Sequence, residues 1–449
     1  MARSIRIGNA QGFWGDSVDA PARLLQQQPD LDYLTLDYLA EVSLSILARQ
    51  QSRDAHLGYA RDFLAVVAQV IPLWKSGHQT RIVCNAGGLN PLACAEACAA
   101  LLREAGVDKR IGVVTGDDVL AQLKGDGSCP NFSNWETGAP VSTVLDSMVT
   151  ANAYIGAAPV AEALGQGADL VVTGRVADPS LAVGIAQHEF GWASNDYHRL
   201  AAATIGGHLL ECGTQMCGGI STGWLDLADP AQMGFPVIEL GEDGGLVVTK
   251  PANTGGAVTE WTVKEQLLYE IGDPKNYLSP DCRVDFTTLT VEDQGNDRVA
   301  VSGATGSAPT DTYKVSATHR DGYWAHGTLT IFGRDAVAKA QRCGEIIFER
   351  LRQAGYDYPR KNIECLGSNA IAPGVLPPRD SGEIVLRVSV AHEDKEAVER
   401  FAKEIAPLVT SGPQGTTGYA GGRPRATPVF GYWPCLIKRD RVTVKVNVL

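Results

Sequence analysis

Short apolar runs alternate with longer helical segments through the first 190 residues of this 449-residue chain. The spacing of the apolar residues predicts strands at 4–8, 32–39, 81–87, 110–116 and 169–174. Parallel strands of one sheet need a crossover between them, and a helix is the usual crossover. The alternation therefore predicts an α/β fold whose N-terminal half is a mainly parallel βαβ sheet, covered on both faces.

The segments between these strands differ in character. Residues 42–74 and 91–106 have helical patterns, and the second opens with Pro91 and ends at Gly106, as helices often do. Residues 124–150, which include GDGSCPNFSNWETGAP, are instead predicted to form an excursion or lid loop.

The second half has the pattern of an α+β domain. FPVIEL and LVVTK flank EDGG, which predicts a hairpin. A β-rich block follows, and then helices at 334–354 and 393–408 are separated by the strand EIVLRVSV, an order that suggests a split βαβ layer. The sequence DPAQMGFP marks the expected boundary, so the predicted domains are 1–232, a parallel α/β domain with glycine-rich ligand loops, and 233–449, an α+β domain.

Composition narrows the classes of partner. The net charge is −12 and the isoelectric point is near 5.2, which argues against nucleic acid. No apolar run approaches the roughly 18 residues of a membrane helix, and MARSIRIGNA lacks the apolar core of an export signal. We therefore expect a cytoplasmic protein with reduced thiols and no membrane partner. Symmetric assemblies of one chain are common, so a homo-oligomer is expected.

Every predicted parallel strand ends in glycine, small polar residues or carboxylates. The segments concerned are GNAQGFWGD (8–16), DYLAE (37–41), NAGGLNP (85–91), TGDD (115–118) and TGRVADPS (173–180). Ligands of open parallel sheets bind beyond the carboxyl ends of the strands. These segments are thus expected to form one ligand site.

Two of these segments are candidate anion-binding loops. Gly12, Gly15 and Asp16 follow the first strand, and Asn85, Gly87 and Gly88 follow the third. The glycines either expose amides to a phosphate or carboxylate at a helix N-terminus, or simply make tight turns with Asp16 or Ser17 as a helix cap. Their spacing does not match GxGxxG, so NAD(P) is not an expected cofactor.

Arg175 follows the fifth strand, which is predicted to be buried, so its positive charge needs an anionic partner there. It is predicted either to clamp the carboxylate or phosphate of a substrate, beside Asp178, or to form a structural pair with Asp178 or Asp37.

The acid–base candidates are Asp37, Glu41, His208 and Glu211. Asp37 and Glu41 follow the second strand, although Glu41 is equally suited to begin a helix. His208, Glu211 and Cys212 share one helix face, a spacing that suits a proton-transfer pair, a metal site or a buried histidine beside a thiol. No third firm ligand lies nearby, so no metal is predicted.

Seven motifs taken together are similar to those of a known family. GFWGD, DYLAE, NAGGLNP, TGRVADPSL, GHLLECG, TGG with EQLLYEIGDP, and NYLSPD resemble the acyclic terpene utilisation protein A (AtuA) family over about residues 4–440. The resemblance implies a role in the breakdown of citronellol- and geraniol-type terpenes and branched acids, beside acyl-CoA carboxylases and enoyl-CoA hydratases. Longer members carry an additional C-terminal ferredoxin-fold domain, which this chain is expected to lack, so a small partner subunit is a further expectation.

The sequence thus favours an enzyme that acts on a carboxylated small molecule or its CoA thioester. Hydratase, dehydratase or C–C lyase chemistry is expected, because acid–base groups and an anion clamp are present without a redox fingerprint. The alternative is a non-catalytic subunit that binds a CoA ester or acts as a scaffold for another enzyme of the pathway.

Overall fold

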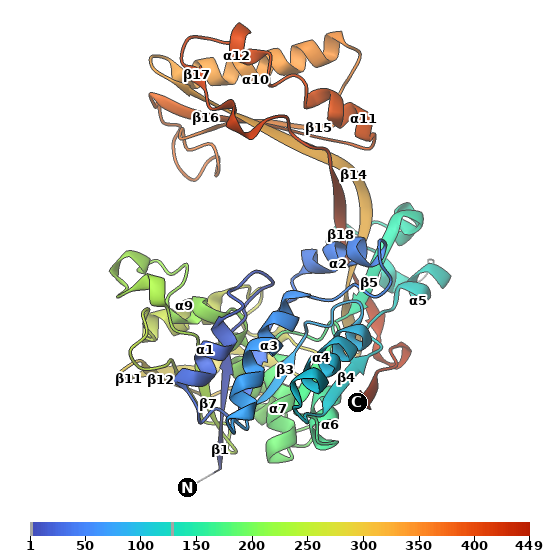
Figure 1. Ribbon diagram of the computed structural model, residues 1–449, viewed down its shortest axis with the longest axis vertical. Helices are drawn as coiled ribbons and strands as arrows, with labels where there is room; N and C mark the ends of the chain where they lie inside the picture. Colours follow the sequence, from blue (N-terminus) through green and yellow to red (C-terminus); the bar gives the residue numbers. More distant parts are fainter. Residues whose placement is uncertain (1–2, 127–129) are drawn as a thin grey trace. The chain divides into compact units, whose positions relative to one another are not determined.

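Five parallel strands form the centre of a ten-stranded sheet (Figure 1). The computed structural model describes residues 3–126 and 130–449. The parallel strands are β1 (Ser4–Asn9), β2 (Tyr33–Leu36), β3 (Arg81–Cys84), β6 (Leu170–Thr173) and β4 (Ile111–Thr115), given in their order across the sheet. Each neighbouring pair is parallel. The predicted α/β fold class is confirmed.

Antiparallel strands continue the sheet on both sides. The hairpin of β7 (Val237–Gly241) and β8 (Leu246–Thr249) pairs with β1, and β12 (Arg298–Ser302) and β11 (Thr290–Gly295) extend it further. On the other side β19 (Lys445–Val448) pairs with β4. These additions cover both edges of the parallel core, which would otherwise present unpaired backbone groups.

Helices pack on both faces of the sheet and create two separate cores. Side chains alternate along a strand, so Tyr33 belongs to one core and Leu34 to the other. One core contains α1 (Ala20–Gln27), α3 (Asp62–Lys75) and α4 (Pro91–Ala105). The other contains α6 (Ala158–Gly165), α7 (Ser180–Phe190) and α8 (Tyr197–Glu211).

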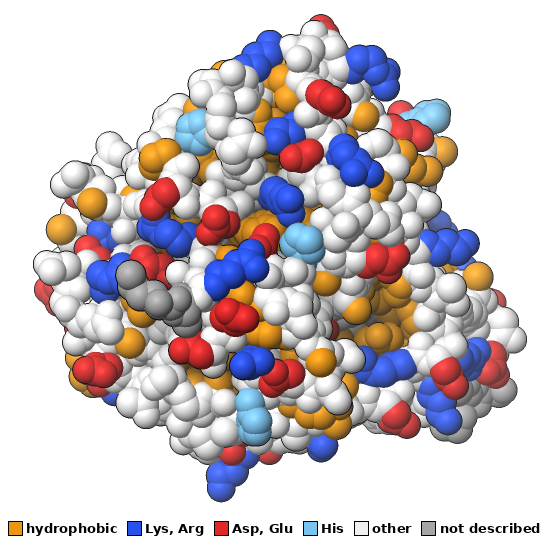
Figure 2. Space-filling view, turned by 90° about the horizontal axis from the view of Figure 1, so that it is seen from below, with side chains coloured by type: hydrophobic (Ala, Val, Ile, Leu, Met, Phe, Trp, Pro, Cys, Tyr) orange, Lys and Arg blue, Asp and Glu red, His pale blue; other side chains and the backbone are white. Residues whose placement is uncertain are grey.

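The surface and the helices have two general features. Basic and acidic side chains are interspersed over the face shown in Figure 2. Among the described helices, none combines the length and the apolar character that crossing a bilayer requires.

The segment predicted as one helix at 42–74 is two helices. The helix α2 (Glu41–Gln51) ends before a loop, and α3 begins at Asp62. Gly58 in this loop has φ +105°, a conformation that interrupts a helix. The Asn90 side chain donates to the carbonyls of Ala55 and Leu57 and so fixes the loop against the start of α4.

The predicted excursion at 124–150 includes residues 127–129, which lie outside the described residues. Its described part contains short 3-10 turns at Pro130–Phe132, Val141–Thr143 and Leu145–Ser147. It leads into β5 (Met148–Ala153), which pairs with the long strand β14 (Thr312–Phe332).

The chain divides into two compact units, but not at the boundary expected near residue 232. One unit comprises residues 1–318 and 432–449, and the other comprises 319–431. The reason is the sheet: β7, β8, β11 and β12 all lie beyond residue 232, yet they extend the sheet that contains β1. Besides β5, β14 pairs with β18 (Thr427–Lys438), and both strands run from one unit into the other.

The second unit has the split βαβ order. The chain runs from β14 through α10 (Ala336–Gln353), β15 (Arg360–Leu366), β16 (Glu383–His392) and α11 (Lys395–Phe401) to α12 (Leu408–Ser411) and β17 (Thr416–Thr417). The strands are arranged β15-β16-β14-β17, which is the split βαβ arrangement. A separate apolar core that includes Leu329, Ile347, Leu386 and Phe401 holds this unit together.

Candidate functional site

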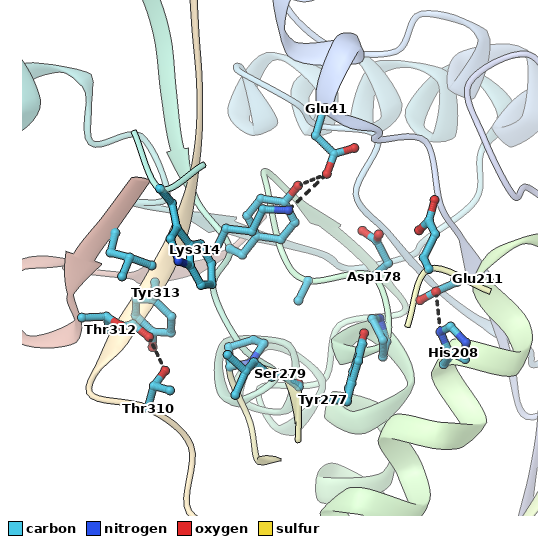
Figure 3. Close-up of a pocket in the computed structure, with 18 residues that line it drawn as sticks. Glu41, Asp178, His208, Glu211, Tyr277, Ser279, Thr310, Thr312, Tyr313 and Lys314 are labelled. Atoms are coloured by element: carbon cyan, nitrogen blue, oxygen red, sulfur yellow. Dashed lines mark hydrogen bonds and ion pairs between the residues drawn. The ribbon is translucent and has the colours of Figure 1, made fainter. Parts of the chain in front are cut away.

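A cavity of about 380 Å³ lies in the first unit, beyond the ends of β2 and β6 (Figure 3). Its volume falls in the range of small-molecule sites. The titratable residues that line it come from several elements: Glu41, Tyr154, Asp178, His208, Glu211, Glu270, Tyr277, Tyr313 and Lys314. Trp135 from the 124–150 segment also contributes to the wall. The fold therefore brings together three of the four predicted acid–base residues.

His208 and Glu211 form a buried pair at the end of α8. His208 Nδ1 lies 2.9 Å from Glu211 Oε1, and His208 Nε2 lies 2.8 Å from the carbonyl oxygen of Gln266. A carbonyl only accepts, so Nε2 carries a hydrogen. The remaining proton of the pair is therefore either on Glu211, with neutral His208, or on Nδ1, with ionised Glu211.

The surroundings of this pair raise the pKa of both of its members. Burial and the nearby charge of Glu270 raise the pKa of Glu211, although His208 opposes the rise. Burial opposes the His208 cation, but the charge and hydrogen bond of Glu211 outweigh it and raise the pKa of His208. Both ring nitrogens of His208 already have partners, whereas Glu211 Oε2 is buried without a protein partner, so Glu211 is the member of the pair with free hydrogen-bonding capacity.

Asp178 lies beside this pair, as Figure 3 shows. Its recessed position raises its pKa well above the ordinary value, and the carboxylates Asp37 and Glu211 add to the rise. The charge of Arg175 opposes the rise. Arg175 also donates a hydrogen bond of 2.7 Å to Asp178 Oδ1. A carboxyl with a raised pKa keeps its proton to a higher pH than an ordinary aspartate does, which suits a general acid.

Lys314 occupies the opposite wall of the cavity (Figure 3). Its Nζ lies 3.3 Å from Glu41 Oε1, and the hydroxyl of Tyr154 donates to the same oxygen at 2.9 Å. Burial opposes the ionisation of Glu41, but Lys314 and the Tyr154 hydrogen bond prevail and lower its pKa. Glu41 also begins α2, as the other interpretation of this residue predicted, and it lines the cavity.

Arg175 is a structural cation behind the cavity wall. It is 1% exposed and donates to the carbonyl of Leu39 at 2.5 Å and to Asp178 at 2.7 Å. Its guanidinium carbon lies 4.1 Å from the centre of the Tyr154 ring. Arg175 is not among the residues that line the cavity. The geometry therefore matches the structural pair with Asp178 that the sequence left open.

Asp37 and Asn85 are buried together beneath the cavity. Asn85 Nδ2 donates to Asp37 Oδ1 at 2.6 Å, and the amide of Leu39 donates to the same oxygen at 3.2 Å. Burial raises the pKa of Asp37 to about 7, against the lowering influence of Arg175. Asp37 is thus placed with the acid–base residues but does not line the cavity.

The glycine loops make close backbone contacts instead of lining the cavity. The amide of Gly12 donates to Asp16 Oδ2 at 2.7 Å, and the amide of Gly88 donates to the carbonyl of Asn85 at 3.2 Å. A Cβ on Gly12 would lie 2.6 Å from the carbonyl carbon of Cys212, and one on Gly87 would lie 2.6 Å from the carbonyl oxygen of Thr173. Gly15 has φ +148°, in a turn after Phe13. These contacts match the tight turns, but the predicted cap is wrong: α1 begins at Ala20 with Asp19 at its N-cap, and the Asp16 carboxylate accepts from the Gly12 amide instead.

Five titratable residues that line the cavity were not among the predicted site residues: Tyr154, Glu270, Tyr277, Tyr313 and Lys314. Glu270 and Tyr277 belong to the motifs EQLLYEIGDP and NYLSPD, so their place in those motifs was an available signal. Glu270 also has φ +58°, a conformation that is uncommon for a residue with a side chain. Lys314 lies on β14, more than 100 residues beyond the other acid–base residues, and only the fold brings it to them.

Burial raises the pKa of Cys212, which opposes formation of the thiolate nucleophile. Within the described part of the chain, no three His, Cys, Asp or Glu side chains are grouped to hold a metal ion.

One comparison with known proteins gives a match. The family model described as "Acyclic terpene utilisation family protein AtuA" matches residues 5–448, which is nearly the whole chain. No curated protein and no solved structure matches the chain significantly.

Proposed function

This chain belongs to the acyclic terpene utilisation family AtuA, and we propose that it is a catabolic enzyme whose cavity performs acid–base chemistry. The proposed substrate is a branched, carboxylated small molecule or the acyl part of its CoA thioester. The proposed reaction is addition or elimination of water, with C–C cleavage as the other lyase reaction open to the same groups. The single observation that carries this proposal is the buried His208–Glu211 pair beside Asp178, opposite Lys314.

In the elimination direction, Glu211 removes a proton from the carbon next to the substrate carboxyl group. Its ionised form exists because His208 holds the other proton of the pair. Asp178 donates its proton to the departing hydroxyl group, which leaves as water, and a carbon–carbon double bond forms. Hydration is the reverse, in which Asp178 takes a proton from water and Glu211 returns one to carbon.

Lys314 provides the contact for the substrate carboxylate. Its ammonium group forms an ion pair with Glu41. A bound carboxylate would interact with the same ammonium group beside Glu41. Among the described residues that line the cavity, Lys314 is the only Lys or Arg. One cation suits a single carboxylate better than a polyphosphate. If a CoA thioester binds, its acyl group occupies the cavity and its phosphates lie outside.

Turnover in isotopically labelled water tests the proposal. The purified protein is incubated in H2¹⁸O with branched unsaturated acids, their hydroxylated counterparts and the CoA thioesters of both, and products are analysed by mass spectrometry. We expect ¹⁸O in a hydroxyl group of one product, and a loss of at least 100-fold in Glu211→Gln.

Glu260→Gln is the matched control, because Glu260 is an exposed glutamate on α9 (Glu260–Leu268), away from the cavity lining. Equal rates in Glu211→Gln and Glu260→Gln would contradict the acid–base role. Binding without turnover would instead favour the alternative, a non-catalytic subunit that binds the acid or its thioester.

A further inference from the structure

A second, much smaller space lies beneath the cavity. Its volume is about 10 Å³, close to the least that one water molecule needs. Three carboxyl groups line it: Asp37, Asp178 and Glu211. Asp178 and Glu211 also line the large cavity, whereas Asp37 does not. The space is therefore located between the acid–base residues of the cavity and the buried carboxyl group of Asp37.

Some of the polar groups around this space have hydrogen-bond partners in the protein, and one does not. Thr35 donates to the carbonyl of Gly8, and Asn9 donates to the carbonyls of Leu210 and Glu211. Asp37 accepts its protein hydrogen bonds at Oδ1. Glu211 is 9% exposed, and its Oε2 is buried without a protein partner. A buried carboxylate oxygen without a partner costs free energy, which a water molecule in this space removes.

We propose that one ordered water molecule occupies this space and relays protons between Glu211 and Asp37, so that Asp37 serves as an internal proton reservoir for the cavity. The catalytic consequence rests on the proposed function, whereas the water and the relay do not. Asp37 does not line the cavity, so it acts on the cavity only through Glu211, to which it supplies protons and from which it takes them.

The transfer balances without any other reactant. The water donates one hydrogen to Glu211 Oε2 and takes one from protonated Asp37, so the water is unchanged, Glu211 becomes neutral and Asp37 becomes ionised. Arg175 stabilises the ionised Asp37, and the other facing charged groups are Asp178 and Glu211 itself, with His208 behind Glu211. The raised pKa of Asp37 leaves it partly protonated near neutral pH, as a reservoir requires.

Two measurements on the intact protein test the relay, and neither depends on turnover. The first is a high-resolution crystal structure, which is expected to show a water within hydrogen-bond distance of Glu211 and Asp37. The second is time-resolved infrared spectroscopy of the protonated carboxyl band of Asp37 after a pH jump, with the band identified by its loss in Asp37→Asn.

Ala182→Val blocks the relay by filling the space, because Ala182 lines it from α7. Ala186→Val is the matched control, one helical turn away on α7 and equally buried but not lining this space. We expect the response of Asp37 to slow at least tenfold in Ala182→Val and to be unchanged in Ala186→Val. Glu211→Gln cannot carry the proton, so it is also expected to slow the response of Asp37. This variant replaces Ala182→Val in the test if Ala182→Val does not fold.

Absence of the water, or an unchanged Asp37 response in Ala182→Val or in folded Glu211→Gln, would overturn the relay. A protein that shows the relay but no turnover would leave the relay standing and overturn the proposed reaction.

Discussion

At the scale of single residues, Arg175 is stable in the interior because the fold gives it three partners at once. The Leu39 carbonyl and Asp178 accept its hydrogen bonds, and the Tyr154 ring contacts its guanidinium group. A buried cation with such partners is costly to remove because the partners then lose their own compensation. Arg175 therefore ties the end of β2 to the start of α7.

Arg175→Met is expected to lower the free energy of unfolding by about 2–4 kcal/mol, because it leaves Asp178 and the Leu39 carbonyl without their donor. Urea unfolding measures this change. Arg199→Met is the control, since Arg199 pairs with Asp196 at the same three-residue spacing but is exposed. It is expected to cost less than about 1 kcal/mol. Equal losses in the two variants would show that the burial of Arg175 has no energetic effect.

Asp37 makes stability depend on pH. Its pKa is about 7 in the folded protein and near 3.8 when unfolded. Between these values the folded state holds a proton that the unfolded state has lost, so Asp37 destabilises the protein as the pH rises through this window. Asp37→Asn keeps the acceptor for Asn85 and removes the charge. We expect the variant to gain stability relative to the parent from pH 5 to pH 8, by on the order of 1–3 kcal/mol. Parallel stability profiles of the two proteins would contradict this expectation.

At the scale of elements, the sequence identifies which segments meet but not which atoms face the ligand. Apolar periodicity locates the parallel strands, whose carboxyl ends share an edge of the sheet. Of the five polar segments at these ends, 37–41 and 173–180 supply residues that line the cavity, whereas 8–16, 85–91 and 115–118 are not in its described lining. The roles of Gly12 and Gly87 depend on how closely other backbones approach them, which no local pattern encodes. Lys314 reaches the cavity only through the pairing of β14 with β5, a contact between distant segments.

The close approach of Gly12 to the end of α8 links the first loop to the site. A methyl group on Gly12 would meet the backbone of Cys212, the residue after Glu211, and backbone atoms have little freedom to move aside. Gly12→Ala is expected to lower the free energy of unfolding by about 1–3 kcal/mol and to weaken ligand binding by displacing Glu211. Calorimetry and urea unfolding measure the two effects.

Gly125→Ala is the matched control, because nothing lies within 4 Å of a Cβ at Gly125, the last residue of α5 (Leu120–Gly125). This control is expected to change neither quantity appreciably. The account of Gly12 fails if its variant behaves like that control.

At the scale of the whole molecule, the two units have separate cores, and all the described residues that line the cavity belong to the first unit. Leu386 is buried in the core of the second unit, so Leu386→Ala is expected to cost about 2–5 kcal/mol there. Hydrogen exchange followed by mass spectrometry is expected to show faster exchange within 319–431 and unchanged protection of β1, β2 and β3. Faster exchange throughout both units would indicate a single cooperative unit.

The proposed position of the carboxylated ligand lies in the cavity, between Lys314 and the His208–Glu211 pair. The most direct test is the melting temperature of the protein with branched acids and their CoA thioesters, since a ligand of the folded state raises it. NAD(P) and free CoA serve as comparison ligands, and Lys314→Met and Glu211→Gln serve as variants. We expect the melting temperature to rise with at least one carboxylated ligand, and we expect this rise to be lost in Lys314→Met. A rise that persists unchanged in both variants would show that the ligand binds elsewhere than between Lys314 and Glu211.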